Sequence, residues 1–216
     1  MKNILFYVFI LCISLNGYSQ NNYSSSYKYV NLKNSKDINP NEQISQGFLE
    51  SMVYTFFSNT EGCYLANVSA IETIGVNAKV SGEQNIFINY KNKDVFFNLK
   101  EPNCKVFKSV KFRLVEATSK VKVLGYATSK YLSEDNNLVI YTSKKLPWYV
   151  QPCLFNFNQI NQSVLRFENL KQQYGLELIK IDKVLNNKDF DKNIKEIITK
   201  KCSHNREEIT APFFIF

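Results

Sequence analysis

The sequence is poor in the residues that most often carry catalysis or break regular structure. Its 216 residues include 1 His, 1 Trp, 7 Gly and 5 Pro. A single histidine leaves little material for imidazole chemistry. So few glycines and prolines exclude a collagen-like or low-complexity chain. By contrast, 44% of the residues are hydrophobic and 14% aromatic, with 17 Phe and 13 Tyr, which favours a globular domain rich in strands.

Long apolar runs are also absent beyond the N-terminus. There Lys2 supplies a positive charge, residues 4–15 (ILFYVFILCISL) are apolar, and small residues stand at Gly17 and Ser19. This order is typical of a secretory signal peptide, with cleavage expected after Ser19. The run has 12 residues, whereas a membrane-spanning helix needs about 20. We therefore predict that residues 1–19 are a signal peptide, and that the exported protein has no transmembrane segment once they are removed.

Four cysteines remain when Cys12 is removed with the signal peptide: Cys63, Cys104, Cys153 and Cys202. An even number in an exported chain predicts two disulfides, and four cysteines allow three pairings. We expect sequential pairing, Cys63 with Cys104 and Cys153 with Cys202, because it closes the shorter loops. The alternative is four buried free thiols, since buried cysteine also behaves as a small hydrophobic residue.

Residues 43–216 are predicted to form a single β-rich domain. Before it, residues 20–42 are polar and rich in Ser and Asn, which indicates a flexible lead-in. Residues 44–57 are ambiguous: their apolar residues recur every four positions as in a helix, but residues 53–57 (VYTFF) have the composition of a strand. We favour a strand in the second half of this segment.

From residue 84 onward, apolar residues stand at every second position, which indicates strands. The alternation continues through residues 106–115, and polar turns join the remaining strands into hairpins. The predicted hairpins cover residues 86–99, 121–142 and 164–184.

A helix is predicted near the end of the domain, from about Lys188 to Lys201. Phe190, Ile194, Ile197 and Ile198 form one apolar stripe at helical spacing, and Asn186 or Asn187 suits the N-cap. Consecutive hairpins without helices between them imply a mainly antiparallel sheet. We predict a mainly β fold, a curved antiparallel sheet or partly open barrel with a C-terminal amphipathic helix packed against it.

Four segments follow one another in a recognisable order: residues 123–126 (VLGY), 139–147 (VIYTSKKLP), 148–155 (WYVQPCLF) and 164–168 (VLRFE). In this order they resemble the GLPGLI family of exported bacterial proteins, mostly from Bacteroidetes. The hexapeptide that names the family is absent, and residues 156–161 (NFNQIN) stand in its place. The resemblance implies export and a β-rich architecture, and it implies no catalytic residue and no ligand.

No catalytic constellation is visible. His204, the sole imidazole, has no Gly-x-Ser-x-Gly motif beside it, and Ser119 with Lys122 matches Ser-x-x-Lys in a predicted strand rather than at a helix start. Cys202 and His204 offer two metal ligands where a closed zinc site needs four. Adjacent carboxylates at Glu207 and Glu208 point apart in either regular structure. We therefore expect no cofactor and no metal.

Two groups of residues are candidates for binding. Trp148 and Tyr149 lie between two prolines, where aromatic rings contact a sugar or a protein partner, although a lone Trp more often plugs a β core. The chain carries a formal net charge of +8, and some of its basic residues are predicted to form a positive stripe on strand faces. These are Lys111, Arg113, Lys120 and Lys122. The stripe is either a surface for anionic lipid headgroups or glycans, or an ordinary solvated sheet face.

The function expected from the sequence is that of an exported envelope protein, located in the periplasm or at the outer-membrane surface, that binds without catalysing a reaction. Its expected partners are an envelope protein, a lipid or an anionic glycan. Export argues against nucleic acid. The competing class is a secreted hydrolase whose acidic or hydroxyl residues converge only in the folded chain.

Overall fold

The computed structural model describes residues 21–33, 47–70, 86–97, 104–107, 110–153, 160–185, 187–202 and 207–209. The predicted signal peptide, with Cys12, lies outside the described residues, and so do His204 and residues 156–159. In the described ranges, no helix combines the length and the apolar character needed to span a membrane.

Strands dominate the structure and join into one twelve-stranded sheet with the order β14-β6-β5-β4-β3-β2-β1-β13-β12-β11-β10-β7. Neighbouring strands are antiparallel except β14 and β6, which run parallel. The strands are β1 (Asn22–Asn31), β2 (Met52–Ser58), β3 (Gly62–Ala70), β4 (Phe87–Asn89), β5 (Asp94–Phe96), β6 (Lys105–Phe107), β7 (Phe112–Glu116), β10 (Ser129–Ser133), β11 (Leu138–Ser143), β12 (Ser163–Asn169), β13 (Tyr174–Val184) and β14 (Glu207–Ile209). A separate short hairpin pairs β8 (Lys122–Val123) with β9 (Tyr126–Ala127).

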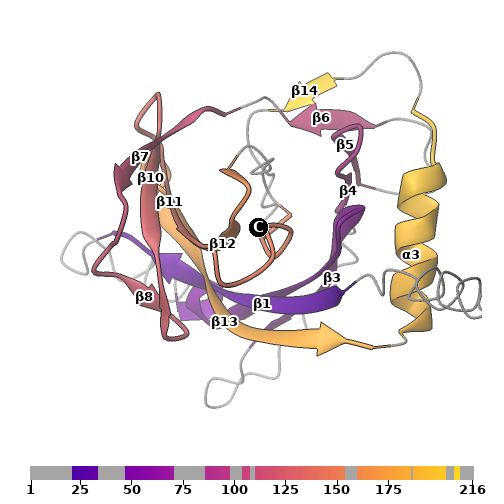
Figure 1. The fold of residues 1–216 in the computed structure, drawn as a ribbon, viewed down its shortest axis with the longest axis horizontal. Helices are drawn as coiled ribbons and strands as arrows, with labels where there is room; N and C mark the ends of the chain where they lie inside the picture. Colours follow the sequence, from indigo (N-terminus) through magenta and orange to yellow (C-terminus); the bar gives the residue numbers. More distant parts are fainter. Residues whose placement is uncertain are drawn as a thin grey trace, which may run out of the picture.

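The sheet is strongly curved. Figure 1 shows it bent into a deep trough, with helix α3 (Lys188–Thr199) outside one wall. The predicted fold class, a curved antiparallel sheet with a C-terminal helix, is confirmed. The predicted hairpins appear as β4–β5, β10–β11 and β12–β13. These pairings are local in sequence, so alternating apolar residues and polar turns are enough to specify them.

Apolar side chains pack on both faces of the sheet. The larger core fills the inner face of the trough, and its most buried members include Tyr27, Phe56, Ile140, Leu165, Phe167 and Leu176. The smaller core lies on the outer face, between the sheet and α3, and contains Tyr64, Phe87, Phe96, Phe190, Ile194 and Ile197. Alternate residues of one strand therefore serve different cores: Ile88 faces the inner core and Phe87 the outer one.

Helix α3 begins where the sequence predicts. The side-chain oxygen of Asn187 accepts hydrogen bonds from the backbone N–H groups of Asp189 and Phe190, both at 3.1 Å. This is the geometry of an N-cap. The helix ends at Thr199, two residues before the predicted end at Lys201.

The apolar stripe of α3 is narrower than predicted. Phe190, Ile194 and Ile197 are buried against the sheet, but Ile198 is 39% exposed. Including Ile198 in the buried stripe was wrong, because the helix contacts the outer face along one line of residues and Ile198 lies beside that line.

The predicted flexible lead-in is wrong for residues 22–31. They form β1, which lies inside the sheet and pairs with β2 on one side and β13 on the other. Ser25 and Tyr27 are fully buried. A polar strand can occupy this inner position because Ser25 is small and because backbone hydrogen bonds join the strand to neighbours on both sides.

The ambiguous segment 44–57 resolves as predicted in its second half. Met52–Ser58 form β2, and the inward residues Tyr54 and Phe56 are buried. Residues 47–50 form a helical turn that ends just before the strand.

The alternating run 106–115 contributes to two strands that lie near opposite ends of the strand order. Residues Lys105–Phe107 form β6 beside β5, and residues Phe112–Glu116 form β7 beside β10. Apolar residues at every second position indicate which side chains share a face of the sheet. They do not indicate which strand pairs with which. The alternation therefore correctly indicates strands but does not specify their partners.

The predicted sequential disulfide pairing is also wrong. Cys63 pairs with Cys153, with Cα atoms 6.0 Å apart, and Cys104 pairs with Cys202 at 5.7 Å. Loop length does not decide the pairing here, because the sheet and α3 bring together cysteines 90 and 98 positions apart. The two disulfides indicate an oxidising, extracytoplasmic setting.

Candidate functional site

The trough of the sheet is occupied by the chain itself. Residues 146–153 run along its inner face, where Val150 and Cys153 are buried. The N–H group of Val164 in β12 donates to the carbonyl oxygen of Val150 at 3.0 Å, and the disulfide from Cys153 to Cys63 ties the other end to β3. We call residues 146–153 the inner segment.

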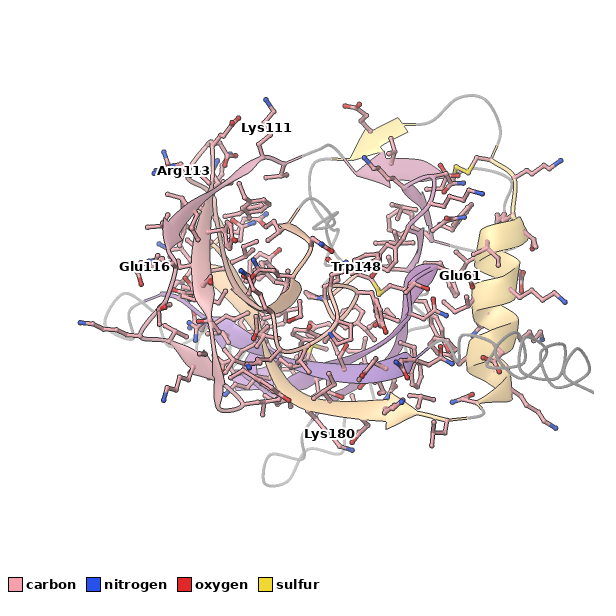
Figure 2. The ribbon with its side chains drawn as sticks, in the orientation of Figure 1. Glu61, Lys111, Arg113, Glu116, Trp148 and Lys180 are labelled. Carbon is pink, nitrogen blue, oxygen red and sulfur yellow. A yellow bond between two sulfur atoms is a disulfide. The ribbon has the colours of Figure 1, made fainter. Side chains whose placement is uncertain are left out.

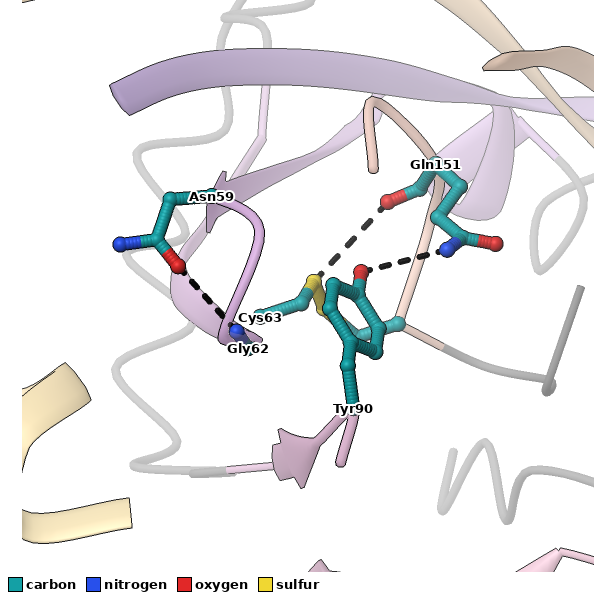
Figure 3. The surroundings of a disulfide bond; sticks show 6 residues. Asn59, Gly62, Cys63, Tyr90 and Gln151 are labelled. Atoms are coloured by element: carbon teal, nitrogen blue, oxygen red, sulfur yellow. Dashed lines mark hydrogen bonds between the residues drawn. A yellow bond between two sulfur atoms is a disulfide. The ribbon is translucent and has the colours of Figure 1, made fainter. Parts of the chain in front are cut away.

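Polar contacts surround this disulfide (Figure 3). The side-chain amide of Gln151 donates to the hydroxyl of Tyr90 at 3.3 Å, and the backbone carbonyl of Gln151 lies 3.9 Å from the sulfur of Cys63. Burial raises the pKa of Tyr90 well above its ordinary value, although its hydrogen bond with Gln151 acts in the opposite direction. The phenol therefore stays neutral and holds the inner segment.

Trp148 and Tyr149, the aromatic binding candidates, belong to the inner segment. The Trp148 ring is half-buried and lies 5.0 Å from the ring of Tyr90 and 5.7 Å from that of Tyr149, measured between centroids. The hydroxyl of Tyr149 donates to the backbone carbonyl of Asn21 at 2.9 Å. Figure 2 shows Trp148 inside the trough rather than on its outer wall. Both rings therefore pack against the chain's own aromatic residues, as a plug does.

The four basic candidates are all exposed. Lys111 and Arg113 lie at the start of β7, and Arg113 donates to the side-chain oxygen of Asn136 at 3.2 Å. Lys120 and Lys122 follow the other end of the strand. Five strand residues span about 17 Å, so the four cations form two groups, one at the start of β7 and one beyond its end, rather than one compact cluster. Figure 2 shows Lys111 and Arg113 together at one end of this wall and Glu116 further along it.

The second basic group lies beside the β8–β9 hairpin. Its turn residues Leu124 and Gly125 have φ angles of 49° and 78°, the left-handed region that tight hairpin turns require. Val123 is buried in the inner core and fixes the hairpin to the sheet. Lys122 therefore lies on a fixed element.

The Ser-x-x-Lys match does not form a catalytic pair. The hydroxyl of Ser119 accepts a hydrogen bond from the backbone N–H of Val121 at 3.2 Å. Ser119 is buried and Lys122 is exposed. The two side chains therefore serve local structure and solvent, respectively.

One cluster of metal-ligating residue types contains the second disulfide. The carboxylate of Asp94 and the sulfurs of Cys104 and Cys202 all lie within 4.8 Å of one another. A thiolate is the form of cysteine that binds a metal, and both sulfurs here are joined to each other. The oxidised donor set therefore does not suit a metal ion.

Sequence reasoning missed an ion-pair network on the outer face. Arg166 in β12 bonds to Glu168 and, across the hairpin, to Glu177 in β13, each at 2.6 Å. Its guanidinium also lies 5.7 Å from the ring centroid of Tyr141. Burial lowers the pKa of Arg166, but the two carboxylates outweigh this effect and raise it. The predicted hairpin could have revealed this network, because its register places Arg166 opposite Glu177.

Comparisons with known proteins identify no family. No family model matches the chain, and no curated protein is significantly similar to it. Among solved structures, PNGF-II in a C2 and a P21 crystal form is similar, with TM-scores of 0.46 and 0.45 and sequence identities of 16% and 17%. The alignments cover 88% of this chain but only 31% and 32% of those chains, so this chain spans about a third of their length.

Proposed function

We propose that the protein is a non-enzymatic binding module of the bacterial envelope, located in the periplasm or at the outer-membrane surface and distantly related to the GLPGLI proteins. It meets its partner with its outer surface. The observation that carries this proposal is the occupied trough, where the inner segment and its disulfide to Cys63 take the place that a ligand has in a carrier protein.

Charge supports an outer binding surface. Lys111, Arg113, Lys120 and Lys122 are exposed along β7 and the β8–β9 hairpin, and Glu116 is the one exposed acidic residue between them. Such a surface attracts an acidic protein, anionic lipid headgroups or an acidic glycan, and the attraction weakens as salt screens it. The three partner classes share this chemistry.

The test measures retention of the mature protein on anionic phosphatidylglycerol vesicles, on beads carrying an acidic polysaccharide and on immobilised acidic envelope proteins. We expect retention on at least one of them, falling steeply between low and high salt. The double variant Lys120→Glu/Lys122→Glu should lower that retention at least tenfold.

The matched control is Lys192→Glu/Lys195→Glu, which makes the same change of charge on the exposed side of α3. It should change retention less than twofold. No retention on any of the three materials, or equal losses in both variants, would contradict a binding surface along β7 and the β8–β9 hairpin.

A further inference from the structure

We propose that edge strand β7 binds an extended acidic segment of a partner protein by adding it to the sheet as a further strand. This inference rests on the proposed binding function and names the kind of partner. It is carried by the position of β7, by its exposed side chains and by a pairing that the chain itself makes at the opposite edge.

Strand β7 stands at the end of the strand order. Within the described ranges it pairs with β10 alone, with Leu114 opposite Tyr131 and Glu116 opposite Lys130. The backbone N–H and C=O groups on its other side therefore face away from the sheet. Such an edge is a template for another strand.

The side chains of β7 leave this edge accessible. All four residues from Arg113 to Glu116 are exposed, and Leu114 and Val115 are 53% and 44% exposed. Exposed apolar residues on an edge strand are unfavourable in water and are usually covered. A partner strand would cover both side chains and also pair with the outward-facing backbone groups of residues 114–116.

At the opposite edge the chain itself extends the sheet by a short strand, in a parallel pairing. There β14 adds to β6, with Glu207 opposite Lys105 and Glu208 opposite Val106. An acidic segment thus lies along a strand that begins with a lysine. Strand β7 is similar, since Lys111 directly precedes it and Arg113 is its second residue.

The charges of β7 define the segment that fits. Lys111 and Arg113 are two positions apart and therefore lie on one face of the strand, while Leu114 lies on the other. The complementary segment carries acidic residues at alternate positions, with apolar residues between them. Opposite charges across two strands stabilise the pair, and like charges destabilise it.

The experiment measures fluorescence anisotropy of a labelled short peptide of alternating Glu and Val with the mature protein. We expect saturable binding that becomes at least tenfold weaker for Lys111→Glu/Arg113→Glu. That variant should instead bind a peptide of alternating Lys and Val. The control Lys192→Glu/Lys195→Glu should bind the acidic peptide within twofold of the unmodified protein.

A second peptide separates strand addition from simple charge attraction. It has the same sequence but carries N-methyl groups on alternate residues, which removes the backbone donors of one edge and leaves the charge unchanged. We expect its binding to be lost. Equal binding of both peptides would overturn strand addition while leaving the electrostatic surface intact.

Two further outcomes decide the remaining alternatives. If the protein alone dimerises with rising concentration and Lys111→Glu/Arg113→Glu abolishes the dimer, a second copy occupies β7 and the proposal is overturned. If the protein binds neither the acidic peptide nor the vesicles, the glycan or the envelope proteins, the proposed function fails as well. Binding to vesicles without binding to the peptide overturns only the present inference.

Discussion

The hydroxyl of Tyr27 donates a 2.8 Å hydrogen bond to the carbonyl oxygen of Val164, although the two residues are 137 positions apart. Both are fully buried. The N–H group of Val164 in turn donates to the inner segment at Val150. One residue of β12 therefore connects the polar strand β1 with the segment that fills the trough.

Replacing Tyr27 with Phe removes this hydrogen bond and leaves the buried carbonyl of Val164 without the phenol. We expect the free energy of unfolding to fall by about 1–3 kcal/mol, the usual cost of an unsatisfied buried group. Urea denaturation followed by circular dichroism measures it. Tyr23→Phe is the control, because the described contacts include no hydrogen bond to the Tyr23 hydroxyl. Equal losses in both variants would show that the bond to Val164 contributes nothing specific.

Alkaline pH should destabilise the protein. Several buried tyrosines have a raised pKa, and burial is the main cause. For Tyr174 it raises the pKa to about 12. These tyrosines also include Tyr27, Tyr54, Tyr64 and Tyr90. In the unfolded chain the same phenols ionise near pH 10. The unfolded state therefore loses protons first, so their contribution to stability is fully present below about pH 10 and is lost as pH rises above it.

Denaturation curves at a series of pH values from 8 to 11 measure this loss. We expect the contribution of these tyrosines to the free energy of unfolding to be constant up to about pH 9.5. Above that pH it should fall steadily. Tyr27→Phe should reduce the slope, since it removes one of the titrating groups. A free energy that stays level up to pH 11 would contradict the burial of these hydroxyls.

The two disulfides should have different effects on Trp148. Removing the first by Cys63→Ala/Cys153→Ala frees the inner segment, so acrylamide should quench the single tryptophan more strongly. Removing the second by Cys104→Ala/Cys202→Ala should leave quenching unchanged. Each removal should cost on the order of 4–5 kcal/mol in the chain-entropy model.

Peptide mapping without reductant checks the pairing directly. It should yield one linked peptide containing Cys63 and Cys153 and another containing Cys104 and Cys202. Linked peptides that join Cys63 to Cys104 would restore the sequential pairing and contradict the structure.

The parts of the fold that sequence predicts are those with local partners. Hairpin β12–β13 turns within a few residues, so alternation and the polar turn are sufficient to specify it. Strand β1 gives no such signal, because Ser25 is buried by partners far along the chain. The cysteine pairing was missed for the same reason: the proximity of Cys63 to Cys153 exists only once the inner segment enters the trough.

The candidate site was predictable in its residues but not in its geometry. Two flanking prolines singled out Trp148, and charge singled out Lys111 and Arg113. Nothing in the sequence indicates that β6 and β7, which follow each other along the chain, lie near opposite ends of the strand order. For that reason the basic residues could be found, but their place on an open sheet edge could not.

Gly62, at the start of β3, lies beside β4 and faces helix α3. A Cβ atom added there would lie 2.7 Å from the carbonyl oxygen of Ile88 and 3.6 Å and 3.7 Å from side-chain atoms of Ile194 and Ile197. The clash is with the backbone of β4, which cannot move aside cheaply, whereas the side chains of α3 are at ordinary contact distance. We expect Gly62→Ala to lower the free energy of unfolding by about 1–3 kcal/mol, the usual cost of overpacking.

Gly47→Ala is the matched control, because no atom lies within 4 Å of the added Cβ there. Its stability should be unchanged or higher by up to about 1 kcal/mol, since alanine restricts the unfolded chain more than glycine does. Urea denaturation of both variants gives the comparison. If Gly62→Ala were as stable as Gly47→Ala, β3 and β4 would have to lie farther apart at this position than the structure places them.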